Sequence, residues 1–94
     1  MGANAIVTFN VMPESPESDF ESIKEQALAI AKAEGAKGEM IAKIEPLAFG
    51  LQKIVIMGMY EMNDDMDFDS ISEKMAAIEG VSNAEVAKMD LAMG

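Results

Sequence analysis

The string DFESI at residues 19–23 returns as DFDSI at residues 67–71, and this repetition decides the fold. Each copy opens a stretch in which apolar residues recur at spacings of three and four, as they do on one face of an amphipathic helix. The sequence therefore predicts two helices of the same design. Their apolar stripes are Phe20, Ile23, Ala27 and Ile30 in the first helix, and Phe68, Ile71, Met75 and Ile78 in the second.

The likeness continues beyond the two helices. EGAKGEMIAKIE (34–45) parallels EGVSNAEVAKMD (79–90), with Glu-Gly and Ala-Lys pairs at the same separation. The helical strings lie 48 residues apart and these later strings 45, so the first half has about one extra helical turn. A five-residue match can arise by chance, but a shared order of elements weakens that alternative.

Four stretches around these helices have the composition of β-strands. AIVTFNVM (5–12) and LQKIVIMGMY (51–60) are the most apolar, whereas EMIAKIE (39–45) is short and partly alternating and VSNAEVAKM (81–89) comes last. A repeated strand–helix–strand unit predicts an α+β, ferredoxin-like βαββαβ sandwich. Right-handed crossovers place both helices on one face of a four-stranded antiparallel sheet, with the two most apolar strands in the middle.

Turn and cap residues mark the ends of the predicted elements. The run PESPES (13–18) ends the first strand, because proline cannot donate to a central ladder, and Ser18 is expected to cap the first helix. We expect Gly35 and Gly38 to end that helix and Gly80 to end the second, since glycine is favoured just after a helix.

The predicted hairpin between the second and third strands has PLAFG (46–50) as its connection. Gly50 can adopt the positive φ that closes such a turn, and Pro46 is expected to interrupt the pairing of the second strand. Phe49 then lies at an end of the sheet, beyond the helices. It either folds back over the end of the core or serves as an aromatic anchor for a partner, which the small neighbours Ala48 and Gly50 would let approach closely.

The composition excludes most enzyme mechanisms. The chain has 94 residues and a net charge of −10, with seven lysines and no cysteine, histidine or arginine. It therefore lacks an imidazole base, a thiolate nucleophile and a bidentate phosphate clamp, and we expect no cofactor and no metal site. Such a charge disfavours direct nucleic-acid binding. Residues 1–94 are expected to form one cytoplasmic domain without a signal peptide or a membrane span.

Two local patterns suggest binding sites, and each has a simpler interpretation. Asp65, Asp67 and Asp69 alternate as in a calcium loop, but Ser70 and Ala76 stand where that loop needs glycine and glutamate. An acidic helix start explains the run better.

The methionines near the end of the third strand could line an adaptable binding surface. Their spacing more often means core and edge filling. They are Met57, Met59, Met62 and Met66.

Three separated motifs, in the right order, together resemble the archaeal elongation factor 1-beta family, and the resemblance covers nearly the whole chain. They are VMPESPESDFESIK (11–24), IEPLAFGLQKI (44–54) and IEGVSNAEV (78–86). The resemblance implies a guanine-nucleotide exchange factor for elongation factor 1-alpha, the GTPase that brings aminoacyl-tRNA to the ribosome. Such a factor is not an enzyme, and it acts by protein–protein binding.

The resemblance also implies a site, at one end of the sandwich. The hairpin loop, with its aromatic residue, would contact the GTPase, and the C-terminal segment (88–93) would approach the nucleotide site and disturb the magnesium ion and the phosphates. The residues so assigned are Pro46, Leu47, Ala48, Phe49 and Gly50 in the loop, and Lys88, Asp90, Leu91 and Met93 in the C-terminal segment.

One feature departs from the family pattern. Eukaryotic relatives have a lysine near the C-terminus that is associated with displacing magnesium, and archaeal relatives usually end in basic residues, whereas no basic residue follows Lys88 here. Lys88 matches Lys43 of the first half and reads equally well as a solvent-exposed strand lysine. Exchange can instead proceed through distortion of the switch region by the tail.

A second function class shares the predicted fold. ACT-type regulatory domains sense small molecules and usually pair through sheet edges or helices, whereas an exchange factor is expected to be a monomer. Acylphosphatase-type enzymes also have this fold, but they need an arginine to hold phosphate, and this chain has none. Oligomeric state is therefore the observation that discriminates between the first two classes.

Overall fold

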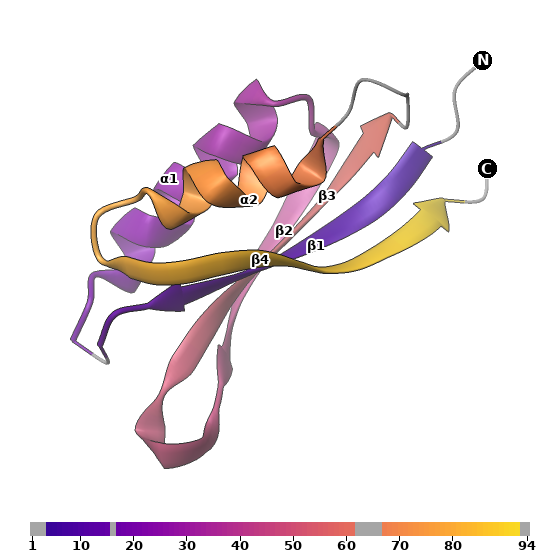
Figure 1. Cartoon of the computed structure of the whole chain (residues 1–94). Helices are drawn as coiled ribbons and strands as arrows, with labels where there is room; N and C mark the ends of the chain where they lie inside the picture. The colour runs from indigo at the N-terminus through magenta and orange to yellow at the C-terminus, as the bar shows by residue number, and fades with distance from the viewer. Residues whose placement is uncertain (1–3, 16, 62–66, 93–94) are drawn as a thin grey trace.

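The computed structural model describes residues 4–15, 17–61 and 67–92, with only the backbone at residues 39, 48, 91 and 92. It confirms the ferredoxin-like order, and Figure 1 shows both helices on one face of the sheet. All strand pairs are antiparallel in the order β2-β3-β1-β4, so the two most apolar strands lie in the middle as predicted. The elements are β1 (Asn4–Pro13), α1 (Phe20–Ala33), β2 (Lys37–Pro46), a 3₁₀ turn η1 (Ala48–Gly50), β3 (Gln52–Glu61), α2 (Phe68–Ala76) and β4 (Val81–Ala92).

The core lies between the helices and the face of the sheet that they cover. Strand side chains alternate between the two faces, so every second residue of β1 is fully buried, as Val7 and Phe9 illustrate. In α1 the buried stripe includes Ala31, whereas the predicted Ile30 is only partly buried at its margin. The opposite face of the sheet has no helix over it (Figure 1).

The repeated DF(E/D)S string is a repeated helix cap. The Asp19 carboxylate accepts a hydrogen bond from the Ser22 backbone N–H at 3.1 Å, and the Asp67 carboxylate accepts one from the Ser70 N–H at 3.2 Å. The predicted cap at Ser18 is wrong, because its hydroxyl is engaged in the preceding turn, where it accepts from the Ser15 N–H at 3.2 Å.

The glycines have different roles from one another. Gly35, with φ 115°, follows the end of α1 as predicted, but Gly38 lies inside β2 at φ 66° and does not end the helix. Gly80, with φ 92°, stands four residues beyond the end of α2, so it closes the turn into β4 rather than the helix itself. Ile78 is buried from this turn, outside the helix.

Tyr60 connects the sheet to both helices in the core. Its ring is fully buried and packs edge-to-face against Phe9 and Phe68, with centroids 6.2 Å and 5.3 Å away. Its hydroxyl donates to the Ala31 carbonyl at 3.5 Å. Burial, with a smaller contribution from the charge of Glu34, raises the pKa of Tyr60 from 10.0 to about 12.

This shift predicts a loss of stability in alkali. Because the folded pKa is the higher one, the unfolded chain gives up the tyrosine proton first. The contribution of Tyr60 is therefore complete below pH 10 and disappears as the pH rises towards about 12. We expect denaturant unfolding to show a falling free energy of unfolding in this interval. Tyr60→Phe should remove that part of the slope, and parallel slopes in the two proteins would contradict the assignment.

Candidate functional site

The β2–β3 hairpin extends beyond the helices and ends in a five-residue loop at one end of the molecule (Figure 1). The Leu47 N–H donates to the Leu51 carbonyl at 2.7 Å and closes this loop. Pro46 pairs with Gln52, so the predicted interruption of strand pairing is wrong. Pro46 is the last residue of an edge strand, where a missing N–H is tolerated.

Phe49 is held at the tip of this loop in an unfavourable conformation. Its side chain is 99% exposed, so the interpretation that it folds back over the core is wrong. Its backbone is left-handed, with φ 63° and ψ 31°, and Gly50 follows with φ 75°. Left-handed backbone costs a residue with a side chain about 1–2 kcal/mol. An exposed phenylalanine gains no free energy of burial to offset this cost. Backbone strain of this kind indicates a functional position.

Exposed apolar side chains gather in the same hairpin. In the part of the chain that the structure describes, five large apolar side chains are exposed, and four of them belong to residues 41–51. They are Ile41, Ile44, Phe49 and Leu51, and the fifth is Met89. Ile44 is opposite Ile54 and so lies on the core face of the sheet, whereas Ile41 and the loop residues Phe49 and Leu51 mark the hairpin as the segment best suited to bury apolar surface against a partner.

The predicted C-terminal site residues lie on β4. Lys88 is opposite Thr8 and Asp90 opposite Ile6 on β1, and both side chains are exposed. The Lys88 ammonium lies 3.5 Å from the Asp90 carboxylate, an exposed ion pair of small energetic value. The backbone of Leu91 pairs with Ala5, and Met93 lies outside the described residues.

The structure separates the two predicted groups. Asn4 pairs with both Glu61 and Ala92, so the C-terminal end of β4 is level with the end of β3. The loop precedes the other end of β3. At about 3.3 Å per residue, the start of β3 at Gln52 is about 17 Å from Met57, which is level with Lys88, and about 26 Å from Tyr60, which is level with Leu91. The expectation that one end of the sandwich engages the partner is therefore revised. A partner that touches both groups must extend along the molecule, whose longest dimension is 44 Å.

The acidic run before α2 has a structural role where it can be followed. Asp67 caps the helix and Asp69 lies in its first turn, whereas Asp65 is outside the described ranges. Within those ranges, no group of three or more histidine, cysteine, aspartate or glutamate side chains could hold a metal ion. The described helices also include none that is long and apolar enough to cross a membrane.

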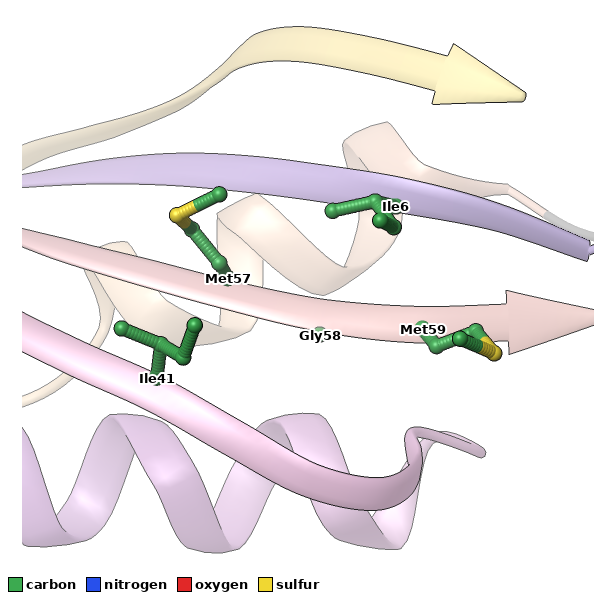
Figure 2. A pocket seen from close by; sticks show the side chains of 5 residues that line it. All are labelled: Ile6, Ile41, Met57, Gly58 and Met59. Carbon is green, nitrogen blue, oxygen red and sulfur yellow. The ribbon is translucent and has the colours of Figure 1, made fainter. Parts of the chain in front are cut away.

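A shallow apolar groove lies on the open face of the sheet, and it contains two of the methionines for which the sequence left a binding surface open. Met57 and Met59 line it together with Ile6, Ile41 and Gly58 (Figure 2). The sequence drew attention to the two methionines, but Met62 and Met66 lie outside the described residues. Because side chains alternate between the two faces of a sheet, the pattern in 39–45 could have placed Ile41 on the face away from the core, where its side chain is exposed.

Comparison with known proteins gives a consistent result. The family model of the EF-1 guanine nucleotide exchange domain matches residues 6–91. Elongation factor 1-beta of Methanococcus maripaludis is 38% identical over 89 residues, covering 95% of this chain and 98% of that protein. Elongation factor 1-beta of Methanosphaerula palustris is 36% identical over 93 residues, and that of Metallosphaera sedula 34% over 84, with at least 88% of each chain covered.

The strain at Phe49 predicts an unusual stability result. Phe49→Gly should raise the free energy of unfolding by up to about 1 kcal/mol, because glycine adopts positive φ without steric cost and no buried contact is lost. Leu51→Gly is the matched control; φ is not positive there, so the same change should lower stability. Urea unfolding of both variants measures the difference, and a destabilised Phe49→Gly would show that the loop conformation is not strained.

Proposed function

The chain belongs to the family of EF-1 guanine nucleotide exchange domains, and we propose that it engages its GTPase through the exposed side chain of Phe49. Its function is guanine-nucleotide exchange on elongation factor 1-alpha in translation elongation. The observation that supports the anchor role is an aromatic ring held fully exposed on a strained loop, at the end of a hairpin that leaves the core.

Exchange of this kind needs no covalent chemistry. A GTPase holds its nucleotide through magnesium and backbone contacts to the phosphates. A factor that prefers the nucleotide-free GTPase weakens nucleotide binding by the same coupling free energy, because such coupling is reciprocal. The absence of histidine, cysteine and arginine is therefore no obstacle to this function.

The anchor role follows from what Phe49 gains on binding. A phenylalanine ring that enters a pocket removes most of its surface from water, and aromatic residues of this kind dominate interface energetics. The hydrogen bond between Leu47 and Leu51 closes the loop that carries Phe49, so the loop backbone loses less conformational entropy on binding than a flexible loop would. Pro46 and Gly50 flank the ring, and both are exposed and leave space around it.

We assign the C-terminal end of β4 to the neighbourhood of the nucleotide. Lys88 is part of β4, opposite Thr8, and Asp90 follows it on the same face of the strand. The exchange step proposed for this chain is therefore distortion of the switch region by residues 88–93, without displacement of magnesium by a lysine.

The remaining features fit a small cytoplasmic factor consisting of one domain. A net charge of −10 speeds encounter with a basic patch on the GTPase. We further propose that the chain is a monomer, which distinguishes it from an ACT-type sensor of the same fold. Sedimentation equilibrium discriminates between the 10.1-kDa chain and its dimer.

The test is the release of a fluorescent GDP analogue from archaeal elongation factor 1-alpha. The parent chain should accelerate release, and Phe49→Ala should reduce the second-order rate of acceleration at least tenfold, since a central aromatic anchor is worth about 2 kcal/mol or more. Leu51→Ala, two residues away in the same hairpin, is the control and should change the rate less than threefold.

Two results would contradict the proposal. If the folded parent leaves GDP release unchanged at micromolar concentration, the chain has lost the activity of its family. If the parent is active and Phe49→Ala remains equally active, the anchor lies elsewhere.

A further inference from the structure

The groove on the open face has the size and lining of a pocket for one apolar side chain. Its volume is about 130 Å³, and its walls are Ile6 on β1, Ile41 on β2, and Met57 and Met59 on β3 (Figure 2). An apolar cavity of about 150 Å³ in another protein is large enough to bind benzene. Methionine side chains adapt their shape to whatever enters such a site.

An irregularity in β2 opens this groove. The pairing register runs from Lys37↔Met59 to Ile41↔Met57, so three residues of β2 stand opposite Gly58 alone. Gly38, at φ 66°, permits this bulge. The strand bends away from β3 at that point, and Gly58 forms part of the groove lining. The hollow is therefore built into the backbone, and no side-chain rearrangement is needed to form it.

The groove differs from the rest of the open face. Ile41 is 56% exposed although it is a large apolar residue. The neighbouring part of the same face is polar, with Thr8 and Asn10 in the middle and three lysines around them. An isolated apolar hollow beside a charged surface is the arrangement of an interface core with its polar rim. The lysines are Lys43, Lys53 and Lys88.

The position of the groove identifies its occupant. It lies on the open face at the level of the proposed C-terminal contact region, because its residue Ile6 is the cross-strand partner of Asp90. At the other side, Ile41 belongs to the strand that leads to the Phe49 loop. The helices cover the opposite face, so a single partner reaches both ends most directly across the open face (Figure 1).

We propose that this groove binds an apolar side chain of elongation factor 1-alpha, and that the GTPase thereby contacts the open face continuously from the Phe49 loop to the end of β4. This inference rests on the proposed function. It adds Ile41 and Met57 to the interface as residues that contribute to affinity.

The experiment compares two variants of one strand. Ile41→Gln places a polar group in the groove, whereas Ile44→Gln makes the same change on the other face of β2, opposite Ile54. The affinity of each for nucleotide-free elongation factor 1-alpha is measured by titration, after thermal unfolding has confirmed that both are folded. Ile41→Gln should weaken binding about tenfold, or about 1.4 kcal/mol, and Ile44→Gln less than twofold.

The outcomes separate this inference from the proposed function. If the parent chain accelerates GDP release and Ile41→Gln binds as tightly as the parent, the groove is not part of the interface. Equal weakening by both variants would also overturn the inference, since the effect would then not depend on the groove. A parent chain that sediments as a dimer, which Ile41→Gln dissociates, would show that a second copy occupies the groove. A parent that fails to accelerate release refutes the proposed function, and direct binding of the two variants still tests the groove.

Discussion

The structure depends on the packing of two short helices against one face of a long sheet. At 1.5 Å per residue the 14-residue α1 is about 21 Å long, whereas the ten-residue β3 is about 33 Å long at 3.3 Å per residue. The helices therefore cannot cover the whole sheet. Phe9, Ile56 and Tyr60 fill the covered region, while the β2–β3 hairpin continues beyond it and has no core of its own.

This mismatch in length explains where function can be placed. The hairpin tip contributes no buried apolar surface, so its residues are free of the requirements of the core. Phe49 exposes an aromatic ring there in a backbone conformation that costs free energy in the isolated protein. Binding of a partner can recover that cost. The same one-sided packing leaves the other face of the sheet open, which is where the groove around Ile41 lies.

Much of the fold follows from the sequence because both copies of its repeated string begin a helix in the same way. The DF(E/D)S strings are N-caps followed by apolar stripes, and these patterns act locally. The two helices could therefore be predicted, and the repeated strand–helix–strand unit predicted the strand order. The sequence could not show whether Ser18 or Asp19 caps α1, because either side chain can accept a hydrogen bond from a helix N–H. The turn before the helix decides between them, since it engages the Ser18 hydroxyl. The bulge at Gly38 depends on the register of β2 against β3, which no local pattern encodes, so the sequence indicated the methionines of the groove but not the hollow between the strands. The separation of Phe49 from the end of β4 follows from the antiparallel topology. The resemblance to known proteins had implied a site at one end only.

The most direct test of a partner lying along the open face is a methyl NMR titration with nucleotide-free elongation factor 1-alpha. Isoleucine, leucine and methionine methyl groups report on both faces and both ends of the sheet at once. The account predicts large shifts for Leu51 in the hairpin, Ile41 in the groove and Ile6 opposite Asp90 of β4, with Ile23 and Met75 beneath the helices nearly unchanged. Shifts confined to one end of the sheet, or centred on the helices, would contradict it.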